Sequence, residues 1–436
     1  MARIDELILY RDFEKGELLR GMNWIMEHYK DCQYRGEVRE RFFGCMHELV
    51  DLAGNYGFEN NLWHAYLTYL LVNNENVFST SCEIKGVTEG SLLQLAKHDF
   101  EIFRELFSYD FTELEQTLKA GFFEEILNYQ SAGAGSKVFN KRIRNRICEL
   151  SDQLGNAKDL EEFTQNMIHF YREFGVGKLG LHKAFRVVHE EEGVQIRPIT
   201  NIAHVNLDDL VGYEIAKKKL IDNTEAFVQG RKANNCLLFG DAGTGKSSSI
   251  KAILNQYYDQ GLRIIEIYKH QFQDMNDVIA QIKNRNYKFI LYMDDLSFEE
   301  FEIEYKYLKA VIEGGLEKKP DNILIYATSN RRHLVREKAS DKLEIADGDD
   351  LHSSDTVQEK LSLAARFGVT INYSKPSQKE YFQIVHELAK KHKLRYTEQE
   401  LDLLANQWEL SHGGISGRTA QQFILSLAGQ KERKTK

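Results

Sequence analysis

Hydrophobic and polar positions change their spacing once along this chain, near residue 207. Before that point apolar residues recur every three to four positions, as in "LWHAYLTYLL" (62–71) and "FEIFRELFSYDFTELEQTL" (100–118), a spacing typical of amphipathic helices. No proline occurs before Pro198, so no ring interrupts these helices. The pattern predicts an all-α N-terminal domain at 1–175, with a turn or hinge at the small-residue run "SAGAGS" (131–136).

The second half of the chain alternates short apolar runs with helical patterns. The apolar runs, which are the expected strands, are "NCLLF" (235–239), "RIIEIY" (263–268), "FILYM" (289–293), "ILIYAT" (323–328) and "VTINY" (369–373). Between them, helices are expected from Gly245, near 274–285 and near 301–314. Strands separated by helices indicate a parallel sheet covered on both faces. The fold class predicted is α/β, with a five-stranded parallel core at 207–375 and a helical lid at 376–436. Residues 176–206, with "AFRVVHEEEGVQIRPI" (184–199), are predicted to form a hairpin or extended linker.

Composition narrows the class of protein. Hydrophobic residues make up 42% and charged residues 28%, as in soluble globular proteins, and no stretch approaches the roughly 18 apolar residues of a membrane span. Residues 1–206 hold 23 Lys and Arg against 32 Asp and Glu, whereas the remainder holds 34 of each. An acidic N-terminal half offers no broad attraction to phosphate backbones. The opening segment fits neither a signal nor a transit peptide, so we expect a cytoplasmic protein.

The five cysteines are widely spaced and form no C-x-x-C pair. Their odd number and spacing indicate neither a disulfide framework nor a zinc site. Buried, reduced thiols are the expected state.

Residues 240–247, "GDAGTGKS", fit the pattern G-x-x-x-x-G-K-[ST] between a strand and a helix, the context that this pattern requires. Glycines let backbone N–H groups surround a phosphate, and the helix start adds partial positive charge. Lys246 is expected to reach the β- and γ-phosphates and Ser247 to ligate Mg²⁺. A glycine-rich turn without a ligand is the alternative interpretation. The predicted nucleotide-binding residues here are Gly240, Asp241, Ala242, Gly243, Thr244, Gly245, Lys246, Ser247 and Ser248.

Two adjacent acids end the apolar run in "FILYMDDLSFEE" (289–300). In sheets of this kind a terminal acid of the strand beside the phosphate loop binds the Mg²⁺ that bridges the phosphates, which fits Asp294. Asp295 would then face the γ-phosphate, where a carboxylate can polarise the attacking water. A pair of residues that caps the following helix is the alternative.

Three further polar residues lie at the ends of predicted strands or helices. Asn330, after "ILIYAT", could hydrogen-bond the attacking water or the γ-phosphate, and a turn-forming asparagine is the alternative. Arg366 lies at the end of a short helix before the last strand. Arg418 lies in the first turn of a lid helix, where a cation opposes the helix dipole, so an anion that it must meet explains it better than helix stability does.

The order of these parts resembles the AAA+ ATPases. Six segments, "DLVGYE", "GTGKSSSIKA", "MDDLSFEE", "IYATSNRRHL", "EKLSLAARFG" and "SGRTAQQFI", are similar to the bacterial family named domain of unknown function 815, over about residues 175–428. The resemblance implies a P-loop (AAA+) sheet that binds ATP and Mg²⁺, in a homo-oligomeric ring or partial ring. It also implies that Leu210, Val211 and Gly212 contact adenine and that Ser247 and Asp294 bind the metal. Asp295 would activate water, and Asn330 and Arg418 would be the first and second sensors. Arg366 would be the arginine finger that acts on the neighbouring subunit.

Two departures from that pattern affect the expected activity. Most AAA+ proteins carry Glu where this chain has Asp295, so slow turnover or a binding-driven switch becomes possible. The segment "YKHQFQDM" (268–275) has Phe272 but no glycine, which disfavours threading of a protein through a pore.

Two other segments bear on partners. The basic stretch "KVFNKRIRNR" (137–146) could meet DNA, RNA or an acidic protein, although a solvated helix face is the simpler interpretation. The acidic insert at 342–360 is expected to be a mobile loop that orders against a neighbouring subunit.

Two hypotheses of different classes follow. The first is an ATP-hydrolysing AAA+ protein that remodels or loads a macromolecular client, a protein or nucleic acid selected by the N-terminal domain. The second is an ATP-dependent binding switch, similar in style to a helicase loader, with little turnover. A GTPase is disfavoured because no N/T-K-x-D segment follows the phosphate loop.

Overall fold

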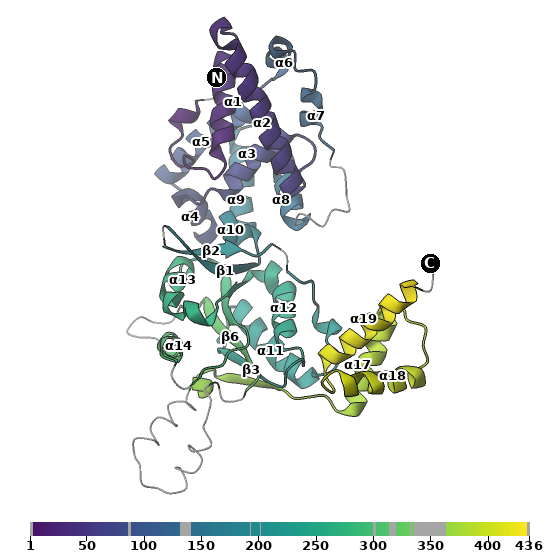
Figure 1. Ribbon diagram of the computed structural model, residues 1–436. Helices are drawn as coiled ribbons and strands as arrows, with labels where there is room; N and C mark the ends of the chain where they lie inside the picture. The colour runs from purple at the N-terminus through teal and green to yellow at the C-terminus, as the bar shows by residue number, and fades with distance from the viewer. Residues whose placement is uncertain are drawn as a thin grey trace. The chain divides into compact units, whose positions relative to one another are not determined.

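The structure is a computed structural model that describes residues 3–85, 89–130, 141–191, 193–200, 202–299, 302–313, 320–331, 334 and 363–433. It divides into two compact units, Met1–His182 and Lys183–Lys436 (Figure 1). The predicted turn at 131–136 and the acidic insert at 342–360 lie outside the described residues.

The regular elements described in the first unit are helices, as the spacing predicted. Besides two short 3-10 turns they are α1 (Gly16–His28), α2 (Arg35–Tyr56), α3 (Leu62–Asn73), α4 (Val77–Lys85), α5 (Ser91–Phe107), α6 (Thr112–Leu118), α7 (Phe123–Leu127), α8 (Lys141–Gly155), α9 (Leu160–Phe174) and α10 (Gly177–Leu181). They share one core with large side chains such as Trp63, Phe103 and Tyr171. Among the described residues, no helix is both long and apolar enough to cross a membrane.

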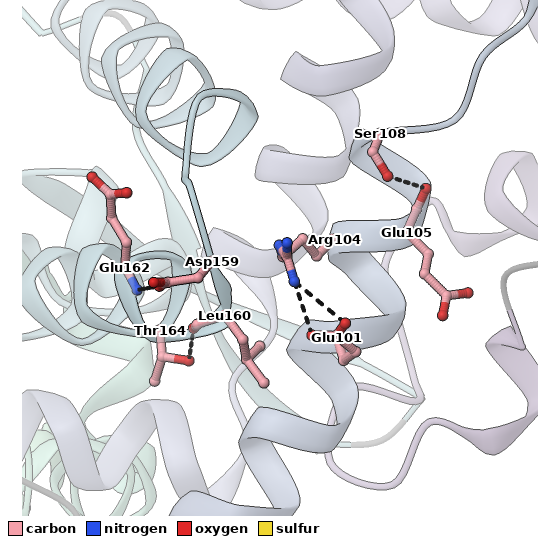
Figure 2. A network of polar contacts seen from close by, with 8 residues as sticks. All are labelled: Glu101, Arg104, Glu105, Ser108, Asp159, Leu160, Glu162 and Thr164. Carbon is pink, nitrogen blue, oxygen red and sulfur yellow. Dashed lines mark hydrogen bonds and ion pairs between the residues drawn. The ribbon is translucent and has the colours of Figure 1, made fainter.

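Two carboxylates of this unit accept hydrogen bonds from backbone N–H groups. Asp99 on α5 is fully buried and accepts hydrogen bonds from the backbone N–H groups of Ile8, Leu9 and Tyr10 at 2.7–3.1 Å. Figure 2 shows Asp159, which caps α9 by accepting from the N–H of Glu162 at 2.8 Å. A side-chain cap of this kind satisfies a donor that the helix itself leaves open.

The second unit is built on one seven-stranded sheet in the order β2-β1-β4-β5-β6-β3-β7. All neighbours are parallel except β1 and β2, which form an antiparallel hairpin on the edge beside β4. The strands are β1 (Ala184–Glu190), β2 (Gly193–Pro198), β3 (Cys236–Gly240), β4 (Leu262–Glu266), β5 (Lys288–Met293), β6 (Ile323–Ser329) and β7 (Val369–Tyr373).

The predicted fold class is confirmed, but the strand number was too low. The five expected strands are β3 to β7, and the segment 184–199 forms the hairpin β1–β2 that joins the same sheet. Ala184 to Arg186 pair in parallel with Ile264 to Glu266, an arrangement that the local hairpin pattern did not indicate.

Helices cover both faces of the sheet, which explains why the residues of its central strands β3, β4, β5 and β6 are mostly buried. One face packs on α11 (Glu214–Val228) and α12 (Lys246–Tyr257), and residues such as Cys236, Leu238 and Ile290 belong to that core. Alternate residues such as Leu237 and Leu291 are fully buried on the other face. Figure 1 shows α13 (Met275–Ile282) and α14 (Glu304–Glu313) on the opposite side of the strands from α11 and α12.

Three helices after β7 pack on one another as the predicted lid, α17 (Gln378–Lys391), α18 (Glu398–Ser411) and α19 (Gly417–Arg433) (Figure 1, yellow). Their shared core includes Tyr381, Leu401 and Phe423. Val211, from the segment before α11, packs against the same core, so the lid also contacts the α/β part of this unit.

The cysteines are free. The prediction of buried thiols holds for Cys45, Cys82 and Cys236, whereas Cys148 is half-buried and Cys32 is exposed, contrary to expectation.

The described part of the basic stretch 137–146 begins α8. Its apolar positions Ile143 and Ile147 are buried, and Arg144 donates to the backbone oxygen of Gly57 at 2.9 Å. One face of this helix therefore belongs to the core of the N-terminal unit.

Candidate nucleotide-binding site

The loop between β3 and α12 has a backbone shape that only glycine allows at its first position. Gly240 has φ 136°, and a Cβ there would lie 2.2 Å from the backbone oxygen of Tyr373 on β7. The loop ends at Gly245, which precedes α12 with φ 95° and caps the helix with no side chain. The start of α12 thus presents backbone N–H groups, and such a helix start favours an anion.

Lys246 is held by three oxygen atoms at the base of this loop. Its Nζ donates to the backbone oxygens of Gly240 at 2.9 Å and Asp241 at 2.7 Å, and to Oδ1 of Asn330 at 2.9 Å. The lysine is 7% exposed. Burial lowers its pKa, and the nearby carboxylates, Asp295 first, oppose that shift.

Asp294, directly after β5, receives several hydroxyl groups on one oxygen. Oδ1 accepts from Ser247 Oγ at 2.7 Å, from Tyr292 OH at 2.7 Å and from Thr328 Oγ1 at 2.6 Å. Partial burial alone would raise the pKa of Asp294, but these hydrogen bonds, with Thr328 the strongest, bring it below its ordinary value. The carboxylate is therefore ionised at neutral pH.

Asp295 and Asn330 contact each other beside the lysine. Asp295 adopts a left-handed backbone with φ 50°, and its Oδ1 accepts from Asn330 Nδ2 at 2.7 Å. Asn330 thus links Lys246, through its oxygen, to Asp295, through its nitrogen. Both strand tips reach this point because parallel strands β5, β6 and β3 end at the same edge of the sheet.

The segment predicted to border adenine lies between the phosphate loop and the lid. A Cβ on Gly245 would meet Leu210 Cδ2 at 3.4 Å, and the backbone oxygen of Leu210 accepts from Lys217 Nζ at 2.8 Å. Gly212 has φ 80°, in the left-handed region. Val211 packs on the lid core, so this segment joins both parts.

Arg418 also meets the phosphate loop. Its backbone N–H donates to the oxygen of Gly243 at 3.1 Å, and a Cβ on Gly243 would approach Arg418 Cβ at 3.1 Å. Ser416 lies equally close to Gly243. The side chain of Arg418 is exposed, and its charge lowers the pKa of Lys246 as the last of several effects.

Arg366 is not brought to this cluster. It precedes Val369, which pairs with Cys236 at the start of β3, whereas the phosphate loop follows the other end of β3. Five residues of strand separate these ends by roughly 13 Å. The guanidinium instead forms an ion pair with Glu313 at the end of α14.

Sequence reasoning missed Tyr292 and Thr328, which both bond Asp294. Each lies two residues before a predicted site residue, Asp294 or Asn330. Because side chains alternate along a strand, that spacing was the available signal. Among the other predicted nucleotide contacts, Asp241 is turned toward the segment after β7, since its Oδ2 accepts from the N–H of Lys375 at 2.8 Å.

Phe272, from the segment compared with pore loops, is 1% exposed and packs edge-on against Phe298 with ring centroids 6.1 Å apart. A buried ring cannot grip a client chain.

The side chains of Ser247 and Asp294 suit a magnesium ion that binds together with a nucleotide. In the described part of the chain, no group of three or more His, Cys, Asp and Glu side chains could hold a metal alone. Ser247 and Asp294 supply a hydroxyl and a carboxylate in contact. Mg²⁺ is commonly bound by one or two carboxylates together with substrate phosphates, so these residues fit such an ion.

The sheet order, the loop after β3, the acids after β5 and the lid define the class, an AAA+ P-loop protein. Within it, the chain belongs to the family described as "Protein of unknown function (DUF815)", which it matches over residues 180–431. The resemblance inferred from the six segments is thereby confirmed.

Comparison with individual proteins gives partial matches. The chain is 35% identical over 71 residues to the replication factor C large subunit of Staphylothermus marinus, and this stretch is 16% of either chain. The FIGL-1 AAA domain in complex with ADP aligns with TM-score 0.36 and 17% identity, over 54% of this chain and 76% of that chain. The Holliday junction branch migration motor RuvB of Thermotoga maritima aligns with TM-score 0.35 and 17% identity, over 50% of this chain and 62% of that chain. The chain therefore spans less than two thirds of RuvB and about a sixth of the replication factor C subunit.

Proposed function

We propose that this protein binds Mg²⁺-ATP and hydrolyses it in order to remodel or load a macromolecular client. One observation carries the proposal, the meeting of Lys246, Asp294, Asp295 and Asn330 at the start of α12. A cation, an ionised carboxylate, a second carboxylate and an amide within one hydrogen-bonded group are the parts that phosphoryl transfer to water needs.

Each residue of the cluster takes a distinct part in this proposal. Lys246 exchanges Asn330 for phosphate oxygens when nucleotide binds, while Ser247 and Asp294 hold the magnesium that neutralises charge on the phosphates. Asp295 orients and polarises the attacking water. Asn330, released from Lys246, donates to the γ-phosphate or to that water.

Calorimetry with ATP tests the binding step in the Lys246→Ala variant. Loss of a charge-assisted phosphate contact is expected to cost about 2 kcal/mol, a drop in affinity of roughly thirtyfold. Lys219→Ala, at an exposed lysine of α11, is the matched control and should bind as the wild type does. Unchanged affinity in Lys246→Ala would refute a phosphate site in this loop.

The distance of Arg366 from its own phosphate loop supports an active site completed by a second copy of the chain. An arginine that acts across subunits can contribute roughly 10³-fold to hydrolysis. Arg366→Ala and Lys246→Ala subunits should each be inactive alone, and their mixture should regain activity at interfaces that pair an intact arginine with an intact loop. Full activity of a monomer at every concentration would contradict this arrangement.

The alternative function, a binding switch with little turnover, has an observation of its own. Asp295 is shorter than the usual Glu, and Asn330 already holds it at 2.7 Å. Multiple-turnover assays with and without client separate the two functions. Sustained hydrolysis favours the remodeller, whereas a single turnover with a lasting change in partner affinity favours the switch.

The client would bind through the N-terminal unit. Between the start of α1, the second half of α2 and α3 this unit has a cleft of about 540 Å³. Phe13, Leu18, Leu52 and Tyr66 supply apolar lining, and the charged residues are Lys15, Glu17, Arg20, Glu48 and Asp51. Capture of client by an Asp295→Asn protein, with and without the added changes Glu48→Lys and Asp51→Lys, tests this role. Equal capture by both proteins would remove the cleft from the proposal.

A further inference from the structure

Asp294 carries more hydrogen bonds than metal binding alone explains. Three hydroxyl groups, from Ser247, Tyr292 and Thr328, all donate to Oδ1 at 2.6–2.7 Å, and none of these three holds Oδ2. Ser247 belongs to the phosphate loop. The other two hydroxyls come from β5 and β6, and the function proposed above assigns them nothing.

The direction of the Thr328 hydrogen bond follows from its partners. The backbone N–H of Asp295 donates to Thr328 Oγ1 at 2.9 Å. A hydroxyl accepts through a lone pair and donates its one proton, so Thr328 can accept from Asp295 and still donate to the carboxylate of Asp294 at 2.6 Å. Thr328 therefore holds the backbone after Asp294 and the carboxylate of Asp294 at the same time.

Tyr292 approaches the same oxygen from within the sheet. It is 5% exposed and lies near the end of β5, which Asp294 directly follows. Its hydroxyl donates to Oδ1 at 2.7 Å. Because Tyr292 belongs to a strand of the sheet, its hydroxyl is a well-ordered donor to Asp294.

We infer that Tyr292 and Thr328 are positioning residues for the metal carboxylate: they hold Asp294 by Oδ1 and so present Oδ2 to the magnesium of the bound nucleotide. This inference rests on the proposed function. Partners that orient a metal-binding carboxylate are worth about 10- to 100-fold in metal affinity when they are removed. A merely structural role would lower stability without changing the preference for magnesium.

The test compares ATP affinity with Mg²⁺ and with EDTA, by calorimetry on the full chain. In Tyr292→Phe and Thr328→Val we expect the gain from Mg²⁺ to fall roughly tenfold, while metal-free ATP affinity stays as in the wild type. Thr328→Ser keeps the hydroxyl and should restore the gain. Titration of Mn²⁺ into the ADP-bound protein, followed by electron paramagnetic resonance, gives a second readout that does not depend on hydrolysis.

Tyr326→Phe is the matched control. Tyr326 pairs with Tyr292 across β5 and β6 and is also buried, but its hydroxyl bonds Asn223 and Thr224. Its loss should leave the gain from Mg²⁺ unchanged.

The possible results separate the two proposals. A wild type that binds no ATP overturns the proposed function and this inference together. A wild type with a gain from Mg²⁺ that Tyr292→Phe and Thr328→Val retain in full overturns the inference alone. Thermal unfolding of each variant shows whether it is folded. If Tyr292→Phe does not fold, the comparison of Thr328→Ser with Thr328→Val still tests the inference.

Discussion

Replacing Asp295 by asparagine should leave nucleotide binding intact and remove hydrolysis. Asp295 has φ 50°, a left-handed conformation that Asn tolerates as well as Asp does. Its Oδ1 accepts from Asn330 at 2.7 Å, and an amide oxygen can accept the same bond. The substitution therefore preserves shape and backbone but loses the charge and basicity that polarise water. Without that help, hydrolysis should fall by about 10²-fold or more, while ATP affinity changes by less than about threefold.

Two companion variants separate the side chain from the backbone. Asp295→Glu supplies the longer acid of most AAA+ proteins, but a left-handed conformation costs such a residue about 1 kcal/mol, so the folded state should be less stable. Asp295→Gly adopts φ 50° without strain and removes the carboxylate. It should bind ATP, unfold near the wild-type temperature and fail to hydrolyse.

Single-turnover hydrolysis with prebound ATP is the assay, because it measures the chemical step apart from binding and product release. Glu299→Gln is measured beside the three variants, since Glu299 lies four residues after Asp295 and its carboxylate is 4.0 Å from Arg331 Nη1. Near-normal hydrolysis by Asp295→Asn together with collapse in Glu299→Gln would refute the assignment and transfer the role to Glu299.

Three further outcomes are expected. Gly240→Ala should abolish ATP binding in calorimetry, because its Cβ would lie 2.2 Å from Tyr373 O, whereas Gly261→Ala, also at positive φ but with open space around it, should bind normally. Asp99→Ala leaves three backbone N–H groups, one buried and two partly buried, without their acceptor and should lower the free energy of unfolding by about 3 kcal/mol in denaturant titration. Burial lowers the pKa of His64, so the unfolded chain takes up that proton first and stability should fall as pH drops below about 6.5; the slope should flatten in His64→Gln.

Local patterns in the sequence were sufficient for the second unit's main strands and for the residues that meet at the ends of those strands. The phosphate loop pattern and the acids of "YMDD" stand at strand ends, and parallel strands that end at one edge bring Lys246, Asp294 and Asn330 together. That step needs only the direction of the strands, which the alternation with helices supplies.

The local patterns could not predict which segments pair over long distances in the sequence. A hairpin or an extended linker was predicted for this segment, but the docking of β1 on β4 depends on the pairing of Ala184 to Arg186 with Ile264 to Glu266, which no local spacing encodes. The ion pair of Arg366 with Glu313 joins residues 53 apart in sequence. Tyr292 and Thr328 look like ordinary strand residues, since tyrosine and threonine favour strands for packing reasons alone.

The same long-range contacts account for the aspartate at position 295. Thr328 bonds the chain on both sides of this residue, because its Oγ1 accepts from the N–H of Asp295 at 2.9 Å and its backbone oxygen accepts from the N–H of Leu296 at 2.7 Å. The turn between these two bonds holds Asp295 in the left-handed region, which is costly for a longer acid and tolerated by Asp. The shorter acid is therefore matched to the turn that ties β5 to β6. A glutamate at 295 should therefore either keep the bond from its N–H to Thr328 and strain the turn, or release that bond and lose the wild-type backbone.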